Sequence, residues 1–263
     1  MSLAVKTSNE LKLNRFLPLL IPLIIYALDE IYFFYPKLIY IVVVLINLLI
    51  FFVVWQFCAK SQVDKEWWNY LILPAIMSSS VMAYSVFLSS KSVIQLLFFL
   101  NLLFLYFYLR HVYYYLLNPI VYEVFSIENI SSYVGWFSFF LFSATIYGLQ
   151  SFLNLPIFRL ALIMLLVAAL IIYQIIWVNK IEFKKGLPYI LISCFILVEL
   201  CWSISFLPFN YNISGLCLAI CFYIVTGLIK NYLLDKLDAA RVKMYLILGL
   251  ASLFLILFTA RWI

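Results

Sequence analysis

The sequence predicts an all-α, polytopic transmembrane helical bundle with eight or nine spans and no soluble domain. Of the 263 residues, 68% are hydrophobic and only 11% are charged, whereas an ordinary soluble domain has roughly 25% charged residues. The charge-free stretches 38–59, 67–90 and 160–179 contain 22, 24 and 20 residues, and about 20 apolar residues are needed to cross a bilayer core. A soluble fold of this size could not bury so much apolar surface, so we expect a membrane protein.

Four spans are expected in the first half of the chain, at 16–35, 38–59, 68–89 and 92–117. The first follows three basic residues within 6–15, as in a signal peptide, but no small-residue cleavage pattern follows it. We therefore expect a retained helix, and Pro18 and Pro22 are expected to bend it. A turn at 36–37 separates the first two spans.

Five further spans are expected at 132–153, 157–178, 187–207, 212–232 and 244–262. The charge-free runs 129–158 and 200–229 each have 30 residues, which is longer than one ordinary span. Each run should therefore contain part of a helical hairpin. We expect 1–263 to form a single membrane domain.

Lys and Arg residues are distributed unequally between the two sides of the predicted bundle. Four lie on one side, namely Lys37, Lys91, Arg159 and Arg261, and the other thirteen lie on the opposite side. Because cytoplasmic loops retain an excess of these residues, we expect the N-terminus to be cytoplasmic and the C-terminus to lie outside if the spans number nine. The net charge of +6 is thus explained by topology, and no nucleic-acid partner is expected.

Glu199 is the clearest ionisable group within a predicted span. It lies among Phe, Ile, Leu and Val residues, and a charged group at the centre of a membrane helix costs about 2.5 to 3.5 kcal/mol on insertion scales. Trp202 and Ser203 share its helical face at i+3 and i+4, so the three side chains could line one cavity and bind a cation or proton. An equally weighted alternative is that Glu199 is a packing device, protonated or hydrogen-bonded to a neighbouring helix.

Asp29 and Glu30 are expected at a similar depth in the outer half of the first span. Arg159 enters the sixth span from the same side, so we predict an outer-half cluster of Asp29, Glu30, Arg159 and Glu199. The alternative, which we favour for Asp29, Glu30 and Arg159, is that they reach the outer interface separately, as charged groups near helix ends do.

The adjacent Arg110 and His111 lie near the inner end of a tyrosine-rich span. They could bind a lipid phosphate on the cytoplasmic side, but the favoured interpretation is an ordinary interfacial aromatic belt. Neutral polar residues within spans are expected to form interhelical hydrogen bonds rather than a substrate path; they are Asn47, 78–80, Asn101, Thr145, Gln150 and Gln174.

Several familiar chemistries leave no signature in this sequence. HExxH, GxSxG and phosphate-binding glycine motifs are missing, and His111 is the sole histidine, so neither a metal site nor a cofactor is expected. The five cysteines all fall within spans, where a thiol behaves as a small apolar side chain.

Two segments resemble an uncharacterised family of bacterial multi-spanning membrane proteins. They are Glu199-Leu-Cys-Trp202-Ser-Ile-Ser-Phe206-Leu-Pro208-Phe and Thr259-Ala-Arg261-Trp262, within the last third of the chain. The resemblance implies a bacterial inner membrane location and supplies neither an activity nor catalytic residues.

The sequence leaves three classes of function open. The leading hypothesis is a non-enzymatic membrane protein whose outer-half carboxylates bind a small cation, a proton or a lipid headgroup. The first alternative is an intramembrane enzyme acting on a lipid-linked substrate, with Glu199 or Asp29 as general base and Arg159 or Arg110 holding a phosphate. The second is a structural or assembly subunit, in which the 20% aromatic residues supply packing surface alone.

Overall fold

Every regular element in the computed structural model is a helix within the residues it describes, which are 2–61, 66–118, 122 and 126–260. Side chains are described from 16 onwards, apart from that of 126. The elements are α1 (Ser2–Phe34), η1 (Pro36–Leu38), α2 (Ile39–Ser61), α3 (Asn69–Ser85), α4 (Lys91–Leu117), α5 (Ser126–Leu153), α6 (Ile157–Val178), α7 (Phe183–Ile204), α8 (Tyr211–Leu233) and α9 (Ala239–Thr259). They form two compact units, 1–131 and 132–263, which are described separately.

Eight of the helices are long and apolar enough to cross a membrane: α1, α2 and α4 to α9. The remaining helix, α3, has 17 residues, which is at the lower end of the range for a span. Many large apolar side chains are exposed, including Tyr40 at 84% and Phe258 at 79%. Contiguous exposed apolar surface of this kind is unfavourable in water but not in lipid, so the predicted class of a polytopic helical bundle is confirmed.

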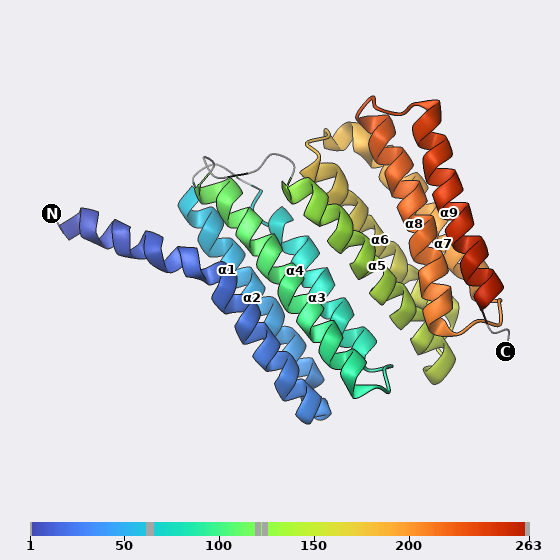
Figure 1. The fold of residues 1–263 in the computed structure, drawn as a ribbon, viewed down its shortest axis with the longest axis horizontal. Coiled ribbons are helices and arrows are strands. Elements are labelled where there is room, and N and C mark those ends of the chain that lie inside the picture. The colour runs from blue at the N-terminus through green and yellow to red at the C-terminus, as the bar shows by residue number, and fades with distance from the viewer. Residues whose placement is uncertain (1, 62–65, 119–121, 123–125, 261–263) are drawn as a thin grey trace. The chain divides into compact units, whose positions relative to one another are not determined.

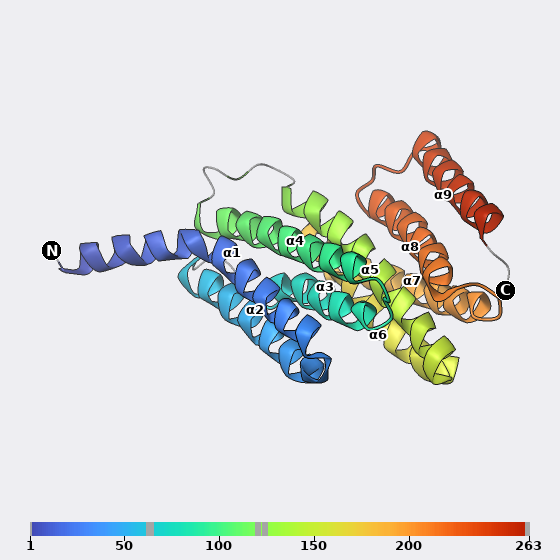
Figure 2. The ribbon, with the colours of Figure 1, turned by 60° about the horizontal axis from the view of Figure 1, so that its bottom comes forward.

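The first unit is a bundle of α1 to α4. Helix α1 packs against α2 and α4, and α3 packs against the same two helices; the four run side by side in both views (Figures 1 and 2). Leu73, Met77 and Val81 of α3 are each exposed by 1% or less. Helix α1 contains Pro18 and Pro22 and changes direction along its length (Figure 1), because a proline removes a backbone hydrogen bond of the helix.

The second unit contains α5 from residue 132 onwards and α6 to α9. Helices α6, α7, α8 and α9 pack in chain order, while α5 lies against α8. A Cβ atom added to Gly215 of α8 would lie 2.6 Å from the backbone nitrogen of Ala144, so the two backbones approach closely through small residues, as is common in membrane bundles. The rings of Phe139 and Phe222 stack 4.1 Å apart in the same contact.

Several helices extend past the apolar segments that predict them. Helix α9 begins at Ala239 rather than 244 because the Asp238 side chain accepts a hydrogen bond of 2.7 Å from the backbone N–H of Arg241 and caps the helix. Helix α7 likewise takes Lys184 and Lys185 into its first turn. Charged residues end an apolar segment, but they do not end a helix.

Candidate functional site

Asp29 lies at the centre of a buried polar contact between three helices of the first unit. Its side chain, on α1, is 0% exposed. The Asn101 amide of α4 donates from Nδ2 to Asp29 Oδ2 at 3.4 Å, and Ser78 of α3 donates from Oγ to Asn101 Oδ1 at 3.4 Å. Asn101 and Ser78 are also fully buried, so the three groups form a chain of hydrogen bonds enclosed by apolar side chains.

One oxygen of this carboxyl group has no hydrogen-bond partner. Asp29 Oδ1 is buried and unpartnered among the residues that the structure describes. Buried polar atoms are almost always satisfied, because leaving one unsatisfied costs about 1 to 3 kcal/mol. The free oxygen is therefore an unusual feature that calls for a functional explanation.

A second and more exposed network lies beside the first. Glu30 is partly exposed and accepts a 3.0 Å hydrogen bond at Oε2 from Gln95 Nε2. The Tyr26 hydroxyl donates to Gln95 Oε1 at 3.2 Å. The successive residues Asp29 and Glu30 thus have different surroundings, because neighbouring positions on a helix point about 100° apart.

Glu199, Trp202 and Ser203 lie together on an exposed face of α7. Trp202 is 55% exposed and packs against Phe206, while the Ser203 hydroxyl donates to the backbone oxygen of Glu199 at 2.8 Å. None of the three lines the pocket described below. The shared helical face is present, but Glu199 is on the surface of its unit.

The structure does not bring the predicted four-residue cluster together within one unit. Asp29 and Glu30 belong to the first unit, whereas Arg159 and Glu199 belong to the second. Arg159 is exposed in the first turn of α6, and no ion pair joins it to Glu199 among the described residues. A cluster of all four stays a prediction.

Arg110 is held by aromatic side chains near the C-terminal end of α4. It donates from Nη1 to the Tyr106 hydroxyl at 2.8 Å, and its guanidinium lies 5.7 Å and 5.6 Å from the ring centroids of Tyr106 and Tyr114. This cation–π arrangement is typical of the aromatic belt considered above. His111 is partly exposed beside it.

The neutral polar residues have several different roles. Asn47 donates to Ser79 Oγ at 3.2 Å, so interhelical hydrogen bonding is confirmed there and at Asn101. Thr145 instead donates to Leu141 of its own helix, and both amide atoms of Gln174 are buried without a partner in the described part of the chain. No group of three or more His, Cys, Asp or Glu residues that could hold a metal occurs among the residues described.

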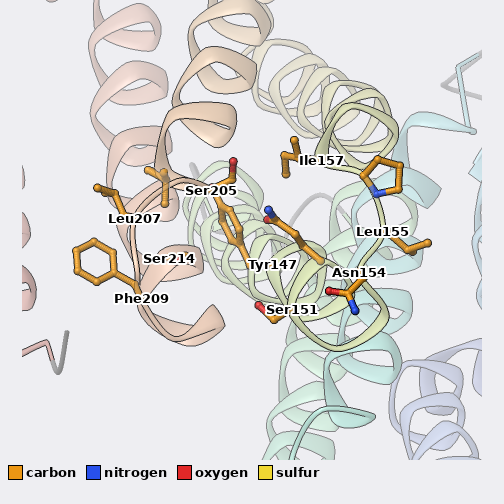
Figure 3. A pocket seen from close by; sticks show the side chains of 12 residues that line it. Tyr147, Ser151, Asn154, Leu155, Ile157, Ser205, Leu207, Phe209 and Ser214 are labelled. Carbon is orange, nitrogen blue, oxygen red and sulfur yellow. The ribbon is translucent and has the colours of Figure 1, made fainter. Parts of the chain in front are cut away.

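The second unit contains a pocket that we did not predict from the ionisable residues of the sequence. It has a volume of about 390 Å³ and lies where α5 and α7 end and where α6 and α8 begin. Figure 3 shows Tyr147, Ser151, Asn154, Ser205 and Ser214 around it. Neutral polar residues near predicted turns were the only available signal, and such residues are common in turns of every kind.

The two helical units, their exposed apolar faces and the buried carboxyl group define a multi-pass α-helical membrane protein. Within that class, the model of the family described as "Protein of unknown function (DUF5656)" matches residues 33–259, so the chain belongs to this family. No curated protein and no solved structure matches it. The expectation of an uncharacterised family is confirmed, and the match extends well beyond the last third of the chain.

Proposed function

We propose that this membrane protein binds and releases a proton at Asp29. The observation that carries the proposal is the unpartnered Oδ1 atom of a fully buried carboxyl group. Ionisable residues inside membrane bundles commonly mark proton or ion pathways. A proton on Oδ1 would remove the charge of a group whose burial is costly.

The hydrogen-bond chain from Asp29 through Asn101 to Ser78 suits two protonation states. With Asp29 ionised, Asn101 donates its Nδ2 proton to the carboxylate and accepts from Ser78, as the contacts are arranged here. With a proton on Oδ1, the Oδ2 atom of Asp29 is still an acceptor, so Asn101 keeps donating to it and accepting from Ser78. The two hydrogen bonds of Asn101 are therefore compatible with either protonation state of Asp29.

A proton fits these contacts better than a metal cation does. Hard cations take six or more oxygen ligands, whereas Asn101 presents a nitrogen donor to Asp29. An N–H group repels a cation but stabilises a carboxylate.

Carbodiimide labelling tests the proposal, because dicyclohexylcarbodiimide reacts with protonated carboxyl groups in apolar surroundings. Full-length protein in detergent would be labelled over a range of pH and the modified residues located by peptide mass spectrometry. We expect labelling of Asp29 that declines as pH rises, and no labelling at this position in Asp29→Asn.

Glu30→Gln is the matched control, since it makes the same change at the neighbouring, more exposed carboxyl group. Labelling of Asp29 should persist in this variant. If Asp29 stays unmodified at every pH while the protein is folded and Glu30 reacts, the proposed proton site is wrong.

A further inference from the structure

The pocket of the second unit is an open hollow between the ends of four helices. Asn154, with φ of 50°, forms the turn between α5 and α6, and the connection from α7 to α8 closes the other side. Its volume of about 390 Å³ is within the range of roughly 300 to 1,000 Å³ typical of small-molecule sites. Both turns lie at the same end of their helical hairpins, and the ends of membrane-spanning helices lie at the level of lipid headgroups.

The polar lining consists of hydroxyl and amide groups, and no Lys, Arg, His, Asp or Glu is among its described residues. These side chains are Tyr147, Gln150, Ser151, Asn154, Ser205 and Ser214. Figure 3 shows the labelled members around a common space, with side chains contributed by α5, its following turn, and the start of α8. The described lining thus offers a ligand hydrogen bonds rather than an ion pair, which favours an uncharged ligand.

Two hydroxyl groups are already fixed by the backbone. The Tyr147 hydroxyl donates to the backbone oxygen of Cys201 at 3.0 Å, and the Ser205 hydroxyl donates to that of Trp202 at 2.6 Å. Because the hydrogen of each hydroxyl group is already used in a bond to the backbone, each oxygen can only accept a hydrogen bond from a ligand. The side-chain amides of Gln150 and Asn154 each add an NH₂ group, which can donate two hydrogen bonds, and a carbonyl oxygen, which can accept.

A ligand that both donates and accepts at several adjacent positions matches this set. Sugar hydroxyl groups donate and accept hydrogen bonds without carrying a charge. Tyr147 and Phe209 supply aromatic surface in the same lining. We propose that the pocket binds a hexosyl group, carried by a glycolipid of the surrounding bilayer. This site is independent of Asp29, which belongs to the other unit.

Native mass spectrometry of the full-length protein in detergent tests the assignment. Three probes would be titrated: monoglucosyldiacylglycerol, phosphatidylglycerol with the same acyl chains, and free glucose as a competitor. We expect preferential binding of the glycolipid over phosphatidylglycerol. We expect an excess of free glucose to displace the glycolipid only in part, because the acyl chains also contribute to binding. Complete displacement by glucose would assign the pocket to a free hexose and overturn the glycolipid as its ligand.

The double variant Gln150→Leu/Asn154→Gly removes both amides, and glycine tolerates the φ of 50° at position 154. It should weaken glycolipid binding by about tenfold or more, since a hydrogen bond contributes about 1 kcal/mol. Gln174→Leu makes the same change at a buried amide of α6 that does not line the pocket, and it should leave binding unchanged. Ser151→Trp, at an exposed position, should block the pocket without affecting the core. Equal binding of both lipids, or glycolipid binding unaffected by the double variant and by Ser151→Trp, would overturn the proposal.

Discussion

Asp29 and Glu199 are both carboxylates within apolar helices, yet their surroundings in the structure are opposite. Asp29 is enclosed by its unit and reaches a single amide, whereas Glu199 is exposed on α7. The cost of a charge in hydrocarbon applies to both. Only at Asp29 do other helices supply polar partners, and this is why the proposed proton site is placed there.

At the residue scale, we expect Asn101→Leu to destabilise the first unit by about 1 to 3 kcal/mol, since it removes the one donor that the described residues offer to a buried carboxyl group. Thermal unfolding in detergent, followed by loss of the monodisperse fraction, measures this change. In the double variant Asp29→Asn/Asn101→Leu the carboxyl group is absent, so part of the loss should be recovered. Equal destabilisation of the single and double variants would show that lost packing, rather than the buried carboxyl group, causes the effect.

At the scale of elements, α5 and α8 depend on a close backbone approach. We expect Gly215→Ala to destabilise the protein by about 1 to 3 kcal/mol because its Cβ would lie 2.6 Å from the backbone nitrogen of Ala144, which cannot move without shifting the helix. Gly249→Ala is the matched control, because its Cβ would meet the flexible end of the Ile224 side chain. Comparison of the two melting temperatures tests this, and a larger loss at Gly249 would contradict it.

The connection between α4 and α5 provides a pH-dependent contact outside the spans. Burial raises the pKa of the Tyr122 hydroxyl to about 12 from an ordinary value of 10.0, and this hydroxyl accepts a 3.4 Å hydrogen bond from the backbone N–H of Ile127 in the first turn of α5. Because the pKa is higher in the folded state, the contribution of Tyr122 to stability is fully present below pH 10 and is lost as pH rises through 12.

We therefore expect the melting temperature of the wild type to fall more steeply between about pH 10 and pH 12 than that of Tyr122→Phe. The variant lacks the ionisable hydroxyl but keeps the ring that packs edge-on against Tyr115 at 5.2 Å. Identical slopes in the two proteins would exclude Tyr122 as the group responsible.

At the scale of the whole molecule, the side of the membrane on which the C-terminus lies depends on whether the short helix α3 crosses the bilayer. Its 17 residues span about 26 Å at 1.5 Å per residue, close to the hydrocarbon thickness of about 30 Å. If α3 crosses together with the eight longer helices, the spans number nine and the C-terminus lies opposite the N-terminus. From the excess of Lys and Arg on one side, we then expect the C-terminus to lie outside.

Fusion of green fluorescent protein to either terminus tests this topology, because the fluorophore does not mature after export through the bacterial secretory channel in an unfolded state. We expect fluorescence from the N-terminal fusion and none from the C-terminal one, with alkaline phosphatase showing the reverse pattern. Fluorescence from both ends would indicate eight spans.

The sequence by itself determined the membrane class and the approximate position of each helix, because long apolar runs are a local property of the chain. It also identified Asp29, Glu30 and Glu199 as costly groups, and Asn101 as a hydrogen-bonding residue. It could not decide which of the carboxylates is enclosed or find the neutral pocket around Gln150 and Asn154. Helices in lipid are apolar on the faces that meet other helices and on those that meet lipid. Hydrophobic periodicity therefore does not mark the face of a helix that points into the bundle. That face is revealed only by the packing of α1 against α4 and of α5 against α8.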